Sequence, residues 1–220
     1  MKRRDKIISN ILISLGACLI LGGALLYGFN TREGNRAYAK SIDQVEKVKD
    51  EISRRMETAP SEEKAEWDPD SKEKIVEGLH SLPEAKALSV VEIDGYPYDG
   101  YLEIPAIDLE MPVVDECNES NLKYFLCRFD GDPYAGDMII AGHNYKKVFR
   151  KIRDLKEGDQ ILFTTMDGEQ FLYEVYEVEI ITGTDTEQML KGDWDLTLFT
   201  CTFGGKERYT VRCVRVIQAT

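Results

Sequence analysis

The pattern of apolar and polar residues divides the chain into three consecutive parts. The first is a run without a charged side chain over residues 7–29, which follows the basic start Lys2-Arg3-Arg4. At ~1.5 Å per residue this run forms a helix of about 35 Å, long enough to cross a hydrocarbon core of about 30 Å. Basic residues before an apolar run favour a cytoplasmic N-terminus. We therefore expect a single-pass anchor in the cell membrane, with the rest of the chain outside the cell.

A cleaved signal peptide is the alternative interpretation of the apolar run. The sequence Ala37-Tyr38-Ala39 has the small-x-small pattern of a cleavage site, but it lies beyond the charged residues Arg32, Glu33 and Arg36. The run is also longer than the roughly 7–15 apolar residues of such a peptide. These features favour a retained anchor.

The second part is polar, with apolar residues at helical spacing. Over residues 36–59 they recur every three or four positions, which predicts a helix with a narrow apolar stripe. The stripe consists of Ala37, Ile42, Val45, Val48, Ile52 and Met56. Such a helix serves either as a stalk beneath a following domain or as a segment that packs on that domain and guards its cleft. Pro69 and Pro83 then bracket a second helical candidate over residues 71–82.

The third part, from residue 98 onward, contains short apolar runs separated by turn residues. Residues 138–141 have the composition of a buried strand, and residues 160–165 and 170–181 that of a hairpin with Asp167-Gly168 in its turn. Many short strands with only small helices predict a mainly β domain. We expect it to close into an antiparallel-rich barrel, because closure removes exposed strand edges.

Short helices and domain boundaries complete the expected organisation. One helix is expected over residues 118–125, with Asn118 or Ser120 as its cap. A second is expected over residues 145–155, and residues 182–192 form a loop or short helix. The shared apolar face of the second helix is Val148, Phe149, Ile152 and Leu155. The expected domains are a cytoplasmic tip and anchor over residues 1–30, a helical, acidic stalk or N-terminal extension over residues 31–97, and the β domain over residues 98–220.

Charge and cysteine usage exclude some functions. The net charge of −12 argues against sequence-independent nucleic-acid binding, which needs a basic face. Of the five cysteines, Cys18 lies in the apolar run and four lie beyond it. These four allow two disulfides, or at most one if one of them is a free nucleophile; Cys117 with Cys127 is a conceivable pair. No CxxC or HxxH spacing suggests zinc, so we expect neither a metal nor a cofactor.

Three side chains at the ends of predicted strands form a candidate catalytic set. Cys201 ends an apolar run just before Gly204-Gly205, His143 follows the buried strand, and Arg208 begins the last β-pattern. A nucleophilic thiolate, a general acid and base, and a cation for the oxyanion are the groups of cysteine acyl transfer. Taken singly, each residue is more often structural. Lys206, Arg212 and Arg215 are alternatives to Arg208.

The motif around the cysteine carries a family resemblance. Thr197-Leu198-Phe199-Thr200-Cys201, followed by an arginine that leads a strand and preceded by a strand-Gly-His element, resembles the sortase family of Gram-positive bacteria. Sortases are membrane-anchored cysteine transpeptidases that join proteins to the cell wall. Ile104-Pro105 with Pro112, and the sequence Leu155-Lys156-Glu157-Gly158-Asp159 before an apolar strand, support the resemblance. It covers roughly residues 98–216.

The resemblance implies a fold, a reaction and a set of roles. The fold is an eight-stranded β-barrel, and the reaction cleaves a Leu-Pro-x-Thr-Gly-like C-terminal sorting signal between Thr and Gly. Cys201 would form the thioester, His143 would serve as general acid and base, and Arg208 would hold the oxyanion. Thr200 and Asn144 are possible supporting residues. The acceptor would be an amine of a lipid-linked peptidoglycan precursor or of a pilin lysine, and no cofactor is needed.

Two other functions remain open at this point. One is a membrane-anchored cell-wall cysteine hydrolase, which the dependence of product on added amine separates from a transpeptidase. The other is a non-catalytic extracellular binding module, which predicts no special reactivity at Cys201.

Trp67-Asp68-Pro69 is loosely similar to the aspartate-aromatic lid of some pilus-building sortases, in a different order.

Overall fold

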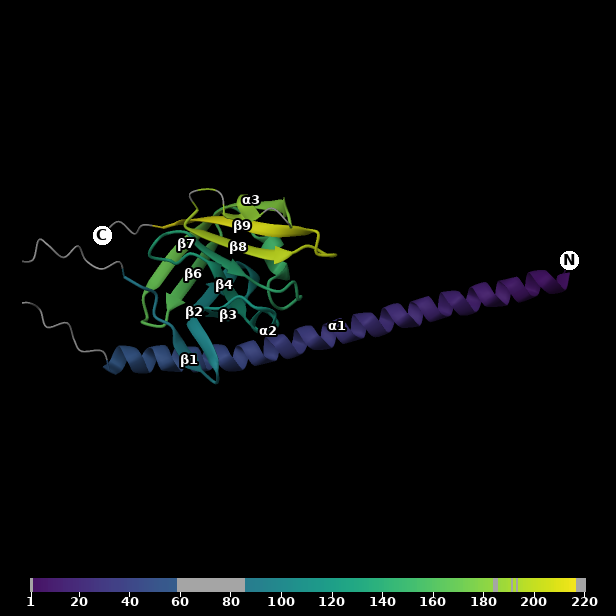
Figure 1. Ribbon diagram of the computed structural model, residues 1–220, viewed down its shortest axis with the longest axis horizontal. Helices are drawn as coiled ribbons and strands as arrows, with labels where there is room; N and C mark the ends of the chain where they lie inside the picture. Colours follow the sequence, from purple (N-terminus) through teal and green to yellow (C-terminus); the bar gives the residue numbers. More distant parts are fainter. Residues whose placement is uncertain (1, 59–85, 184–185, 191, 193, 217–220) are drawn as a thin grey trace, which may run out of the picture.

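The computed structural model describes residues 2–58, 86–183, 186–190, 192 and 194–216. It consists of one very long helix and a barrel of strands (Figure 1). The predicted helix over residues 71–82 and the lid-like sequence Trp67-Asp68-Pro69 lie outside the described residues.

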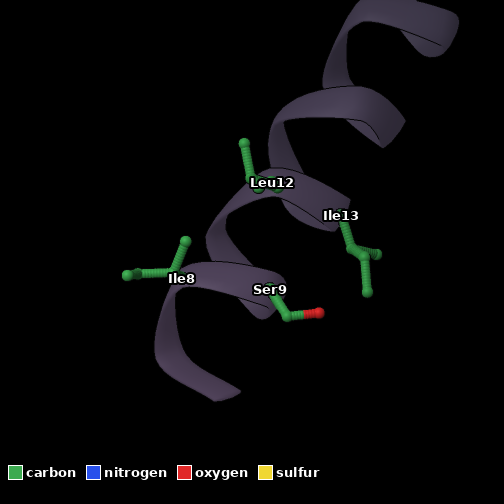
Figure 2. A pocket seen from close by; sticks show the side chains of 4 residues that line it. All are labelled: Ile8, Ser9, Leu12 and Ile13. Carbon is green, nitrogen blue, oxygen red and sulfur yellow. The ribbon is translucent and has the colours of Figure 1, made fainter. Parts of the chain in front are cut away.

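Helix α1 is continuous over Lys2–Thr58, where the sequence indicated an apolar helix and a separate polar one. Its N-terminal half extends away from the barrel, and its C-terminal half lies along the barrel (Figure 1). The N-terminal half holds a window long and apolar enough to cross a membrane, and none of that window is buried. Figure 2 shows the side chains of Ile8, Ser9, Leu12 and Ile13, which project from the helix around a shallow surface hollow. Exposed apolar side chains at this density suit a lipid environment.

The C-terminal half of α1 packs on the barrel through part of the predicted stripe. Ala37, Val45, Val48 and Ile52 are buried, whereas Ile42 and Met56 are exposed. Val48 and Ile52 belong to an apolar cluster with residues of the barrel strands, including Tyr98. Of the two interpretations of this segment, the contacts favour a helix packed on the domain.

The barrel is built from short strands joined by turns and single-turn helices. The strands are β1 (Val91–Ile93), β2 (Tyr96–Ile104), β3 (Leu109–Val114), β4 (Leu126–Asp130), β5 (Met138–Ala141), β6 (Gln160–Thr165), β7 (Gln170–Thr182), β8 (Leu196–Cys201) and β9 (Glu207–Arg215). The short helices are η2 (Pro105–Ile107), α2 (Glu119–Leu122), η3 (Arg150–Asp154) and α3 (Thr186–Leu190).

Pairing of β2 with β6 closes the sheet into a ring. The order around the ring is β2-β3-β4-β5-β8-β9-β7-β6, and β1 adds to β2 outside it. The predicted eight-stranded closed barrel is therefore confirmed. Most pairs are antiparallel, but β3 runs parallel to β4 and β5 runs parallel to β8. The parallel pair of β5 with β8 matters for the site, because the carboxyl ends of both strands reach the same edge.

The predicted local elements agree with the structure in most places. The strand over residues 138–141 and the hairpin of β6 with β7 are confirmed. Asn118 caps α2, and its side chain accepts a hydrogen bond from the amide of Asn121 at 2.9 Å. The segment 145–155 differs: it forms turns and then the 3-10 helix η3, although the four apolar residues of its predicted face are all buried. The cause is the carbonyl oxygen of His143, which accepts hydrogen bonds from the amides of both Tyr145 and Phe149 and so holds the segment in tight turns.

Candidate active site

The register of β5 against β8 brings the candidate histidine beside the candidate cysteine. Ala141 pairs with Phe199, and the amide of Gly142 continues the ladder with a 3.1 Å hydrogen bond to the carbonyl of Phe199. His143 and Cys201 each lie two residues further along these parallel strands. Both side chains therefore arrive at the same edge of the barrel.

A buried hydroxyl fixes this arrangement. Thr200 is buried, and its Oγ1 donates a 2.7 Å hydrogen bond to the carbonyl oxygen of Gly142. Gly142 itself has no room for a side chain, because a Cβ there would lie 2.3 Å from the ring of Phe149. The residues that precede His143 and Cys201 are thus held together by packing and by one hydrogen bond.

Arg208 lies across from Cys201 on the neighbouring strand. The two residues are register partners in the antiparallel pair of β8 with β9. Directly opposed residues send their side chains to the same face, with Cβ atoms about 5 Å apart. Nη1 of Arg208 donates to the carbonyls of Gly205, at 2.9 Å, and Glu207, at 3.0 Å. These two hydrogen bonds hold the guanidinium against the turn between the strands.

Cys201 and His143 line one cavity, of about 390 Å³. Its wall includes Tyr145 beside the histidine, residues of α2 and the turn after it, and Glu33 of helix α1. The carboxylate of Glu33 accepts from Nζ of Lys123 at 3.3 Å, which joins α1 to the far wall of the cavity. Arg208 is not among the residues that line this cavity. The structure therefore brings Cys201 and His143 into one cavity. Arg208 lies outside that cavity, on the strand that pairs with the strand of Cys201.

The environment of His143 favours the neutral imidazole. Burial lowers the pKa of His143 from its usual value, and the carboxylate of Glu33 acts in the opposite direction. The ring of His143 also contacts the ring of Tyr145 edge to face, with centroids 4.2 Å apart. A neutral imidazole at neutral pH can accept a proton from a thiol or an amine.

The alternative arginines and the supporting asparagine have other partners. The guanidinium of Arg212 is buried and donates to Glu179, Thr197 and the carbonyls of Gln188 and Met189. The guanidinium of Arg215 stacks on the ring of Phe171, 4.6 Å from its centroid. Asn144 accepts from Nε of Arg150 at 3.1 Å, so its side-chain oxygen is directed to that guanidinium.

The other cysteines lie away from the cavity. Cys213 is buried in the core, and burial raises the pKa of its thiol. Cys127 is buried and Cys117 is exposed; both are free thiols. Within the described residues, no group of three or more histidines, cysteines or carboxylates is arranged to hold a metal ion.

Sequence reasoning missed Glu33 and Tyr145 as parts of this site. Tyr145 lies two residues after His143, and this closeness in sequence was the only available signal that Tyr145 belongs to the site. Glu33 carries no motif, and only the packing of α1 on the barrel brings it to the cavity.

Comparisons with known proteins agree with the barrel and with the motif. The family model described as "Sortase domain" matches residues 102–216. Sortase D of Bacillus subtilis is 32% identical over 90 residues, which are 40% of this chain and 44% of that protein. The chain thus matches less than half the length of this curated relative.

Two solved structures show the same fold. The Sortase D5 transpeptidase of Clostridium perfringens superposes with a TM-score of 0.55 at 22% identity, covering 81% of this chain and 99% of that one. Sortase C1 of Streptococcus agalactiae superposes with a TM-score of 0.56 at 21% identity, covering 80% of this chain and 100% of that one.

Proposed function

Because the chain belongs to the sortase family, we propose that it is a cysteine transpeptidase that cleaves a Leu-Pro-x-Thr-Gly-like signal between Thr and Gly. The observation that carries the proposal is the shared cavity of Cys201 and His143 at the carboxyl ends of two parallel strands. A nucleophile beside a base is the arrangement that covalent acyl transfer needs.

In the first half-reaction, His143 takes the proton of the Cys201 thiol, and Sγ attacks the carbonyl carbon of the signal's Thr. The C–N bond to Gly then breaks, and His143 gives a proton to the departing amine. The product is a thioester between Cys201 and the substrate protein. We assign stabilisation of the developing oxyanion to the guanidinium of Arg208, because Arg208 is the register partner of Cys201.

In the second half-reaction, an amine attacks the thioester carbon. His143 takes the proton from the attacking amine, the C–S bond breaks, and the leaving Cys201 thiolate receives that proton from His143. Neither step uses an external oxidant, reductant or cofactor. The acceptor is an amine of a lipid-linked peptidoglycan precursor or of a pilin lysine.

The exposed apolar half of α1 would hold the proposed enzyme at the membrane. We assign residues 1–30 to a cytoplasmic tip and membrane anchor, residues 31–97 to an extracellular extension that begins with the packed half of α1, and residues 98–220 to the catalytic barrel. Secreted substrates and lipid-linked acceptors are both confined to the membrane face. An anchored enzyme therefore meets both at high local concentration.

The test uses the full chain in detergent with a quenched Leu-Pro-x-Thr-Gly peptide, with and without an amine. Cys201→Ala is compared with Cys213→Ala, which removes a buried thiol outside the cavity. We expect cleavage, a mass-detected acyl-enzyme and an amine adduct in the wild type, all lost only in Cys201→Ala. Cleavage product whose amount and mass do not change when the amine is added would indicate a hydrolase. Equal alkylation of Cys201 and Cys213, without cleavage, would favour a binding module.

A further inference from the structure

A second cavity, of about 420 Å³, lies between helix α1 and the segment that follows His143. Its α1 side runs from Tyr27 to Asn35, and its other side is formed by residues 145–151. Tyr145 lines both this cavity and the cavity that holds Cys201. The two spaces are therefore neighbours with a common wall.

The second cavity is strongly basic. Lys146, Lys147, Arg150 and Lys151 line it, and no Asp or Glu is among its lining residues. This is a local exception in a chain whose net charge is −12. Within the described ranges, none of the four cations forms an ion pair with a carboxylate. The cavity therefore presents positive charge that the protein itself does not neutralise.

Most of these cations are held in place by neutral groups. Arg150 donates to the side chain and to the carbonyl of Asn144, each at 3.1 Å. Lys151 donates to the carbonyl of Ile107 at 2.8 Å, and Nζ of Lys147 lies 5.1 Å from the ring centroid of Tyr38. Positioned cations without carboxylate partners favour an anionic ligand.

The position of the cavity along α1 indicates the source of that anion. Tyr27 belongs to the uncharged run of residues 7–29, and the cavity continues to Asn35, beyond the end of that run. At ~1.5 Å per residue, Gly34 lies about 8 Å past Phe29 along the helix axis. The headgroup layer beyond the hydrocarbon core is of similar thickness, roughly 5–8 Å on each side. The cavity thus lies at the depth of lipid phosphates.

We infer that this cavity binds the phosphate of an anionic glycerophospholipid at the membrane surface from which the barrel emerges. The inference rests on the proposed membrane anchoring of α1. Lys146 and Lys147 attract the phosphate as point charges, and Arg150 offers its planar fork of donors. A bound headgroup contacts the segment that carries Tyr145, and so fixes the neighbouring cavity of Cys201 close to the membrane surface.

The test measures lipid retention by native mass spectrometry of the full chain in detergent. Phosphatidylglycerol is the probe, phosphatidylcholine is the neutral-headgroup comparison, and the variant is Lys146→Gln with Lys147→Gln. The matched control is Arg153→Gln with Lys156→Gln, which removes the same charge from exposed positions that do not line the cavity. Each lysine near an anionic headgroup contributes a factor of roughly five, so the double variant should bind phosphatidylglycerol about 25-fold more weakly. The control should bind as the wild type does.

Several results would overturn the inference. These are equal retention of the two lipids by the wild type, unchanged binding in the double variant, or complete displacement of the lipid by inorganic phosphate, which would indicate a site for free anions. The readout is independent of the proposed chemistry. Loss of lipid selectivity in the double variant, with normal acyl-enzyme formation at Cys201, supports the inference. Lipid selectivity in the wild type without any acyl-enzyme contradicts only the proposed function.

Discussion

Oγ1 of Thr200 donates a 2.7 Å hydrogen bond to the carbonyl oxygen of Gly142. The two residues directly precede Cys201 and His143, so this one bond links the backbone of the candidate nucleophile to that of the candidate base. Both partners are buried, and water cannot replace the donor if it is removed. The bond therefore matters for stability and for the separation of the two reactive side chains.

We predict that Thr200→Val lowers both stability and activity. Valine has nearly the same shape but leaves the carbonyl of Gly142 without its donor, at a cost of about 1–3 kcal/mol. Denaturant unfolding measures the first effect, and the rate of acyl-enzyme formation measures the second. Thr200→Ser keeps the hydroxyl and should restore most of the rate. Equal rates in the valine and serine variants would show that the bond does not position the site.

Substitutions of Arg208 and Arg212 should distinguish a catalytic arginine from a structural one. Arg208→Lys keeps a charge opposite Cys201 but loses the guanidinium geometry. Its rate should fall on the order of 100-fold with little change in stability. Arg212→Lys removes several donors from a buried network and should lower the melting temperature. Activity assays beside thermal unfolding distinguish the two, and a reversed pattern would move the oxyanion role from Arg208 to Arg212.

The cysteines should differ in their reaction with iodoacetamide. Burial protects Cys127 and Cys213, whose thiols also have raised pKa values. The thiol of Cys127 hydrogen-bonds to Cys117 and lowers its pKa, so Cys117 should react together with Cys201. Peptide mass analysis at neutral pH measures each site. Rapid labelling of Cys213 in the folded protein would contradict the packing of the barrel core.

The packed half of α1 should contribute to the stability of the barrel. Ile52 is 5% exposed against barrel side chains, so Ile52→Ala should cost about 2–5 kcal/mol. Ile42 is 38% exposed on the same helix, and Ile42→Ala is the matched control with a much smaller effect. Denaturant unfolding of the full chain, followed by near-UV circular dichroism, compares them. Equal small effects would indicate a helix that does not support the fold.

The sequence predicts the strands well, because alternation and turn residues are local signals. β5 coincides with the predicted strand over residues 138–141, and the β6–β7 hairpin lies where Asp167-Gly168 indicated a turn. The parallel pairing of β5 with β8 is different. Nothing local in either strand specifies this pairing. The sequence placed His143 and Cys201 at strand ends as a candidate catalytic set, and the family resemblance supported that set.

The path of α1 depends on tertiary contacts that no local pattern encodes. The polar stretch with Gly34 separates an apolar run from a helical stripe, so it resembled a boundary between elements. In the structure it is continuous helix, and Gly34 packs against the barrel segment that carries Tyr145: a Cβ at Gly34 would lie 3.4 Å from the side chain of Tyr145, an ordinary contact distance. The same close approach carries Glu33 to the candidate site, where sequence analysis placed no acidic residue.

Glu33 should therefore influence the titration of His143. Its carboxylate raises the pKa of the imidazole against the lowering effect of burial. Glu33→Gln removes that stabilisation of the imidazolium and leaves the cation of Lys123 without its partner, so both changes should lower the pKa of His143 further. Glu119→Gln is the matched control, since Glu119 also lines the cavity.

NMR titration of the imidazole C–H resonances measures this shift, in a His80→Gln background that leaves His143 as the sole histidine. The other ionisable groups that line the cavity are Lys123, Tyr145, Glu119 and Cys201, and they are unchanged in Glu33→Gln. A fall in the pKa of His143 in this variant, absent in Glu119→Gln, would establish that helix α1 tunes the candidate base directly. An unchanged or higher pKa would mean that the contact between α1 and the cavity carries no electrostatic effect on the chemistry.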